Sequence, residues 1–287
     1  MITGSSKSIR DTLLNLSQKE DILFQQVVTR YLHERLLYRL SLSEYKQNFI
    51  LKGGNLLYAL SGLHARPTVD IDMLAEKVVN NMENLKAIFV EVCTIKYDDD
   101  CVVFDPSTIK VSEISEEKKH SGIRLLIEAR FDTIKQTIQI DIGFDDIVTP
   151  APLSLQYPIL LEGLEHPDIM AYSLETVIAE KFHAMVVHGT LNSRMKDFYD
   201  TYILFNNEDI NDNILKEAIA QTFKQRDTDF AQNTPIFSED FVTDPNRILR
   251  WNHFLKKIDA DDLEFSVVVK SILERLWPIY DELRQSQ

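Results

Sequence analysis

The stretch FILKGGNLLYALSGLHARPTVDIDML, residues 49–74, decides how we interpret this chain. It predicts a short strand that ends at Gly53 and Gly54, a helix that opens there, and a second strand that carries Asp70 and Asp72. In a strand, residues two apart face the same way, so the two aspartates share one face and their apolar neighbours share the other. The pattern therefore predicts a sheet with an apolar core face and an acidic face.

A later strand repeats this arrangement. In IQIDIGF, residues 138–144, the isoleucines face one way and Asp141 faces the other. Neighbouring carboxylates repel each other unless a cation lies between them, and carboxylate oxygens are the ligands that Mg²⁺ prefers. Asp70, Asp72 and Asp141 are therefore predicted to hold two Mg²⁺ ions, with Mn²⁺ as an alternative, as in phosphoryl-transfer sites. The opposing interpretation is three solvent-facing acids on a half-exposed sheet.

The paired glycines have a physical role of their own. A strand that ends in Gly-Gly and opens a helix lets backbone N–H groups approach a phosphate at the positive end of the helix dipole. We expect Gly53 and Gly54 to contact a triphosphate, and Asn55 to cap the helix and to contact the nucleotide phosphate. Lys52 and Arg66 carry the charge for further phosphate contacts, and ordinary loop cations are the alternative for both.

A lysine lies on the apolar side of a later helix. In SLETVIAEKFHAMVVHG, residues 173–189, the apolar side chains form one stripe and Lys181 falls within it. A buried ammonium needs an anionic partner, which predicts either a structural ion pair or a contact with a nucleotide phosphate. Asp197 can pair with this lysine, Arg194 adds positive charge, and Asp200 is expected to support its own helix.

Taken together, Gly-Gly, a helix, Asp-x-Asp on the next strand and a later acid resemble the nucleotidyltransferase superfamily that includes DNA polymerase beta. More narrowly, residues 51–72 and 179–204 are similar to the AbiEii/AbiGii-type nucleotidyltransferase toxins of bacterial toxin–antitoxin and phage-defence systems. The resemblance spans residues 49–204. The chain departs from the superfamily at Asn55, where a small hydroxyl residue is usual, and in a slightly long gap between the glycines and the acids.

This resemblance implies an activity and a set of roles. The three acids would hold the metal ions, and Asp141 would help to deprotonate the attacking hydroxyl. The glycines and Lys181 would position the triphosphate of an NTP, and Lys181 and Asp197 match the active-site lysine and aspartate of the toxins. The acceptor would be an RNA, such as the 3′ end of tRNA, or a protein. A separate antitoxin would be the partner.

The organisation of the chain predicts two domains. Its 287 residues suffice for one large or two modest domains. Four prolines within residues 148–168 mark the best boundary. We predict an α+β fold. A nucleotidyltransferase domain with a mixed sheet, flanking helices and N-terminal helices covers residues 1–165. A helical domain over residues 166–287 completes the active-site cleft.

Composition excludes some classes of protein. A net charge of −14 argues against a surface that grips nucleic acid throughout, so any such contact must be local, although acidity also serves solubility alone. No apolar run approaches the roughly 20 residues of a membrane span. Two cysteines make no disulfide framework, which favours the cytoplasm. A non-catalytic interaction module of the same fold and a metal-dependent nuclease remain the alternative functions.

Overall fold

The computed structural model describes residues 5–116, 120–189, 193–231, 234–260 and 262–286. Contacts along the backbone divide the chain into two compact units. The first unit comprises Met1–Asp145 and Pro152–Tyr172, and the second comprises Asp146–Ala151 and Ser173–Gln287.

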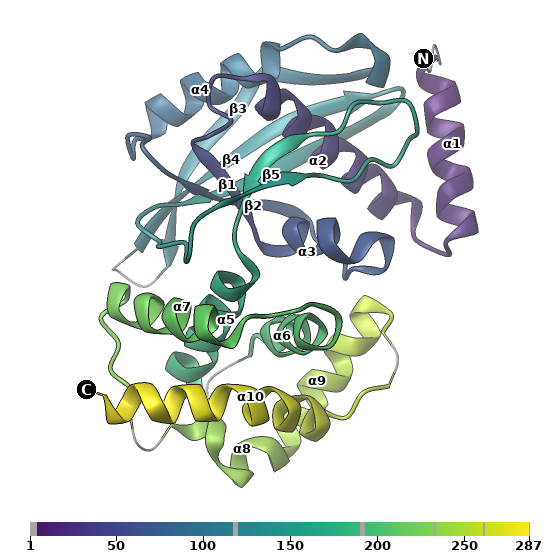
Figure 1. The fold of residues 1–287 in the computed structure, drawn as a ribbon. Helices are drawn as coiled ribbons and strands as arrows, with labels where there is room; N and C mark the ends of the chain where they lie inside the picture. Colours follow the sequence, from purple (N-terminus) through teal and green to yellow (C-terminus); the bar gives the residue numbers. More distant parts are fainter. Residues whose placement is uncertain (1–4, 117–119, 190–192, 232–233, 261, 287) are drawn as a thin grey trace. The chain divides into compact units, whose positions relative to one another are not determined.

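The first unit is built on a seven-stranded sheet with the order β3-β4-β5-β2-β1-β7-β6 (Figure 1). Its strands are β1 (Phe49–Lys52), β2 (Asp70–Ala75), β3 (Val102–Glu116), β4 (His120–Phe131), β5 (Ile134–Gly143), β6 (Leu153–Gln156) and β7 (Asp168–Ala171). The pairs β2–β5 and β1–β7 are parallel and the remaining pairs are antiparallel. The predicted mixed sheet is therefore confirmed.

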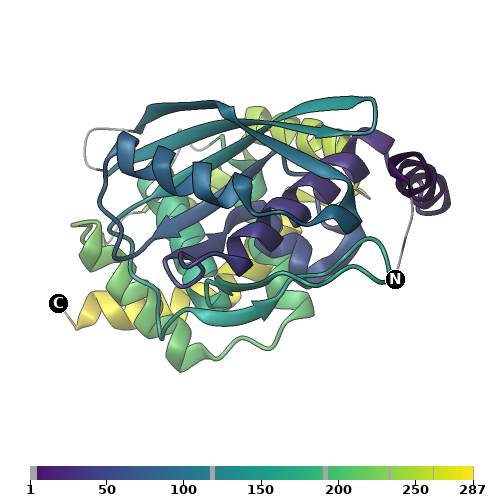
Figure 2. The same cartoon turned by 90° about the horizontal axis from the view of Figure 1, so that it is seen from above.

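Two long helices cover the apolar face of this sheet. The helices of the first unit are α1 (Ser6–Lys19), α2 (Phe24–Leu42), α3 (Gly53–Ser61) and α4 (Met82–Thr94), with short 3₁₀ turns η1 (Gly62–His64) and η2 (Asp98–Asp100). Phe49 of β1 packs edge-on against Phe89 of α4, and Phe131 of β4 packs in the same way against Tyr31 of α2. Figure 2 shows α2 and α4 lying across the strands.

The second unit is helical, as predicted. It contains α5 (Leu174–His188), α6 (Met195–Asn207), α7 (Asp212–Gln225), α8 (Glu239–Thr243), α9 (Pro245–Ile258), α10 (Phe265–Gln285) and the 3₁₀ turn η4 (Pro235–Phe237). Aromatic side chains fill its core, among them Phe182, Phe223 and Tyr280, which contact one another. Among the described residues, none of the helices combines the length and apolar character needed to cross a membrane.

The first unit extends beyond residue 165, where the proline-rich segment was predicted to end the first domain. That segment contains β6, and β7 begins at its last residue, so residues 166–172 lie with the first unit rather than with the helices. The two strands escaped prediction because prolines argue against a strand. Within the described part of the chain, β6 forms the edge of the sheet beside β7, and the four prolines lie outside both strands.

Candidate metal and nucleotide site

Three carboxylates converge on one face of the first unit's sheet. The parallel register of β2 and β5 places Asp72 directly opposite Asp141, and Asp70 lies two positions earlier on the same face. One ligand oxygen from each side chain lies within 4.8 Å of the others, and all three residues are half-buried. The alternating residues Ile71 and Ile140 are fully buried on the opposite face. Hard oxygen donors at this spacing fit a divalent cation.

The register also places a cation on each side of these acids. Lys52 of β1 lies opposite Asp72, and Arg124 of β4 lies opposite Asp141. Across β1, β2, β5 and β4 the sheet therefore presents cation, acid, acid, cation in one row, which we call the charged row. At its β1 end, the Lys52 Nζ donates a hydrogen bond of 3.3 Å to the hydroxyl of Tyr172.

Arg124 binds Asp141 through both of its carboxylate oxygens. The guanidinium Nε donates to Oδ1 at 2.8 Å and Nη2 donates to Oδ2 at 2.7 Å. The Gln139 amide adds a hydrogen bond of 3.1 Å to Oδ2. The hydrogen bond to Asp141 raises the pKa of Arg124. Sequence reasoning missed this arginine, although the two-residue turn between β4 and β5 determines which residue faces Asp141.

The paired glycines lie against the acidic strand. Gly53 opens α3 with φ at +67°, and a Cβ atom built on it would lie 2.0 Å from Oδ2 of Asp72. A Cβ atom on Gly54 would lie 2.5 Å from the Thr68 hydroxyl oxygen. That hydroxyl donates to Oδ1 of Asp70 at 3.0 Å. The missing Cβ of Gly53 leaves room for the Asp72 side chain, and that of Gly54 leaves room for Thr68, which binds Asp70. Thr68 is a second residue that the sequence analysis did not predict.

Asn55 has a different place from the predicted one. Lys52 is the N-cap residue of α3, so the prediction that Asn55 caps this helix is wrong. The positive φ of Gly53 starts the helix early and turns the Asn55 side chain into the interior. Its Nδ2 donates to the Asp70 carbonyl at 2.6 Å, and its Oδ1 accepts from the Tyr157 hydroxyl at 3.0 Å. Asn55 thus ties the acidic strand to the core, and its contact with a nucleotide stays a prediction.

A histidine completes this buried network. The His33 Nδ1 lies 3.3 Å from Oδ1 of Asn55 and is placed to donate to it. Burial lowers the pKa of His33 to about 4, so the ring is neutral at pH 7. A neutral ring can donate from Nδ1 without bringing a charge into the core.

We expect Tyr157→Phe to lower the free energy of unfolding by about 1–2 kcal/mol, because it leaves a buried amide oxygen with one donor fewer. Tyr157 is fully buried. The matched control is Tyr45→Phe, which removes a hydroxyl from an exposed hydrogen bond with Glu91 and should change stability by less than about 0.5 kcal/mol. Urea unfolding of both variants measures the difference. Equal stabilities would contradict the structural role of the Asn55 network.

The second unit holds the predicted lysine in an ion cluster whose two carboxylates are buried. The Lys181 Nζ lies 2.7 Å from Oδ2 of Asp200 and 3.2 Å from Oδ1 of Asp197. Arg194 approaches the other oxygen of Asp197 at 2.7 Å. Burial opposes ionisation of Asp197, but the charges of Lys181 and Arg194 outweigh it and lower the pKa of that carboxyl group. The expected pairing with Asp197 is present, and Asp200, which was expected to support its own helix, also pairs with Lys181.

The residues predicted to contact phosphate are divided between the two units. Lys52, Gly53 and Gly54 adjoin the acid cluster, and Arg66 lies in the loop four residues before Asp70. Lys181, Asp197 and Arg194 belong to the second unit. The nucleotide-binding roles of these basic residues and glycines stay predictions, as does the catalytic role of Asp197.

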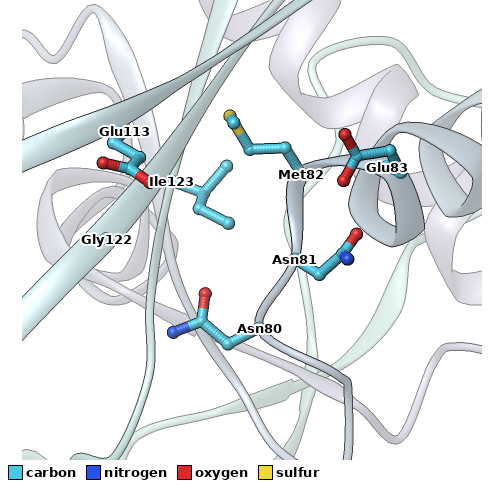
Figure 3. Close-up of a pocket in the computed structure, with 7 residues that line it drawn as sticks. All are labelled: Asn80, Asn81, Met82, Glu83, Glu113, Gly122 and Ile123. Atoms are coloured by element: carbon cyan, nitrogen blue, oxygen red, sulfur yellow. The ribbon is translucent and has the colours of Figure 1, made fainter.

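A pocket of about 290 Å³ lies away from this cluster (Figure 3). Residues at the start of α4 and on β3 and β4 line it: Asn80, Asn81, Met82, Glu83, Glu113, Gly122 and Ile123. Ile123 alternates with Arg124 along β4, so its side chain points to the opposite face from the acids. Among the residues that the structure describes, the lining contains two carboxylates and no basic side chain.

Known proteins resemble this chain in fold and in sequence pattern. The profile of the family described as "Nucleotidyl transferase AbiEii toxin, Type IV TA system" matches residues 35–276. The crystal structure of a candidate nucleotidyltransferase from Helicobacter pylori is 14% identical, with a TM-score of 0.51 over 92% of this chain and 98% of that one. The structure of JHP933 from the same organism is 14% identical, with a TM-score of 0.46 over 88% and 90% of the two chains. Curated protein sequences yield no match.

The family match extends well beyond the acid cluster. It takes in β1, the paired glycines, all three acids and the Lys181 cluster, which are the parts from which the resemblance was predicted. The likeness to the first H. pylori structure supports the fold alone. The protein belongs to the AbiEii family of nucleotidyl transferase toxins from type IV toxin–antitoxin systems.

Proposed function

We propose that this protein is a Mg²⁺-dependent nucleotidyltransferase that transfers an NMP from an NTP to an acceptor. The observation that carries the proposal is the convergence of Asp70, Asp72 and Asp141 beside a helix that opens with Gly-Gly. We propose an RNA acceptor, such as the 3′ end of tRNA, with a protein acceptor as the alternative. The biological setting would be that of a cytoplasmic toxin with a separate antitoxin as its partner.

In the proposed reaction, the acidic residues would bind cations and the glycines would position the triphosphate. Asp70, Asp72 and Asp141 would hold two divalent cations, with Mn²⁺ able to replace Mg²⁺. Bound there, the cations neutralise phosphate charge and acidify a hydroxyl that approaches them. Asp141 would accept the proton of the attacking hydroxyl. The backbone N–H groups at Gly53 and Gly54 would orient the triphosphate.

Basic side chains would complete the binding of the nucleotide. We assign Lys52 and Arg66 to phosphate contacts because they lie on the strand end and the loop that border the acids. Lys181 is proposed as a further phosphate ligand, and Asp197 and Arg194 would position it. Catalysis by such a site is mostly positioning and stabilisation of charge in the transition state.

The test is incubation with each labelled NTP in turn, with Mg²⁺ and total RNA. We expect wild type to label and lengthen an RNA, and Asp72→Asn to reduce the rate roughly 100-fold because a carboxylate that binds cations is lost. Glu113→Gln is the matched control, since it removes an exposed acid from β3 of the same sheet and should keep the wild-type rate.

The same assay separates the alternatives. RNA that becomes shorter instead of longer would indicate a nuclease. Absence of label on RNA and protein from wild type and Asp72→Asn alike, together with no binding of Mg²⁺–NTP in calorimetry, would favour a non-catalytic interaction module.

A further inference from the structure

Within the charged row, Arg124 forms an ion pair with Asp141, one of the three acids. Arg124 engages both oxygens of Asp141 in a fork, at 2.8 and 2.7 Å, and Gln139 adds a third donor. A carboxylate bound in this way has its charge compensated and three of its roughly four lone-pair positions used. A divalent cation that takes an oxygen of Asp141 must therefore compete with the guanidinium.

The Arg124 side chain is exposed enough to move away from Asp141. Its side chain is 38% exposed, whereas that of Asp141 is 16% exposed. The guanidinium can therefore move toward water, but the carboxylate is held by β5 in the centre of the sheet. The acid stays in the cluster when the arginine moves, so the exchange needs only one side-chain rotation.

We propose that Arg124 is a positioning residue that competes with divalent cations for Asp141 and so sets the cation concentration at which the acid cluster fills. In the cation-free protein it compensates the charge of Asp141 and fixes the orientation of that carboxylate. When a cation takes Asp141, the freed guanidinium remains one strand away, where its fork suits a phosphate. This inference rests on the proposed function, because it takes the three acids as the cation site.

The chain offers a matched control on the same strand. Arg130 lies on the same face of β4, six residues from Arg124, and its Nε donates to Glu128 at 2.8 Å. It pairs with acids outside the cluster, Glu128 and Asp105. Removing Arg130 therefore takes the same charge from the same strand without touching Asp141.

The experiment measures Mn²⁺ binding to the full chain by electron paramagnetic resonance, with no nucleotide present. We expect Arg124→Met to bind Mn²⁺ roughly tenfold more tightly than wild type, because one nearby positive charge and one competitor are lost. Arg130→Met should match wild type. Arg124→Lys keeps the charge without the fork and should fall between wild type and Arg124→Met. Circular dichroism of each variant shows that the fold is kept.

Each result decides something. Equal or weaker Mn²⁺ binding by Arg124→Met would overturn the competition, and if Asp72→Asn still lost binding, the proposed cation site would stand. Tighter binding by both arginine variants would also overturn it, because a general effect of charge would then suffice. Absence of Mn²⁺ binding in wild type and Arg124→Met alike would overturn both the competition and the proposed cation site.

Discussion

Replacing Gly53 with alanine is expected to lower the free energy of unfolding by about 3 kcal/mol and to remove Mn²⁺ binding and nucleotide transfer together. The added Cβ would lie 2.0 Å from the carboxylate oxygen of Asp72 and 2.8 Å from its Cβ, so the whole side chain must move. Overpacking of this kind costs about 1–3 kcal/mol, and a left-handed φ adds about 1–2 kcal/mol for a residue with a Cβ. The displaced carboxylate would no longer meet its two partners.

Gly62 supplies the control for Gly53→Ala. Its φ of +69° is close to that of Gly53, and its ψ of −151° also favours glycine, but no heavy atom lies within 4 Å of a Cβ built there. Gly62→Ala should therefore lose only a backbone contribution of about 1–3 kcal/mol and keep both Mn²⁺ binding and transfer. Urea unfolding, Mn²⁺ titration and the labelling assay compare the two variants. Equal losses in all three would show that backbone conformation alone explains the effect.

Asp100→Ala is expected to lower the free energy of unfolding by about 3–5 kcal/mol, because it leaves a buried arginine without its counter-ion. Asp100 and Arg39 are both buried, and the guanidinium of Arg39 forks onto the carboxylate. The same carboxylate also accepts from the Val102 backbone N–H at 3.0 Å, which ties η2 to the start of β3. One substitution therefore removes a counter-ion and a connection between two elements.

The neighbouring Asp99 is the control for this change. It belongs to the same run of three aspartates, but it is exposed. Asp99→Ala should shift stability by less than about 0.5 kcal/mol, as surface substitutions usually do. The pair is compared by urea denaturation at pH 7. A loss below about 1 kcal/mol for Asp100→Ala would mean that water reaches Arg39 and replaces the acid.

These three aspartates show where sequence reasoning reaches its limit. The two-residue period of β2 and β5 predicted which side chains share a face, because that property is local to each strand. Asp98, Asp99 and Asp100 look alike in the sequence, yet Asp100 is fully buried. Its burial depends on an arginine 61 residues earlier in the chain, and no local pattern reports such a pair.

In the candidate site, too, local features were predicted and contacts between distant segments were not. The convergence of the acids followed from strand periodicity, and the family resemblance supplied their order along the chain. The contacts of Arg124 with Asp141 and of Thr68 with Asp70 were not predicted. The first depends on which strands become neighbours, and the second on how closely the start of α3 approaches the segment before β2. Asn55 was misplaced because its helix starts from a glycine with positive φ, so a residue expected at the cap lies in the third position of the helix.

The parallel pairing of β2 with β5 has a consequence for how the protein is made. Asp72 and its cross-strand partner Asp141 are 69 residues apart (141 − 72 = 69). During synthesis from the N-terminus, Asp70 and Asp72 leave the ribosome well before the third acid, and the cluster can assemble only after β5 has emerged and docked beside β2. A chain interrupted before that point carries the glycines and the first two acids but cannot form the complete three-acid cluster.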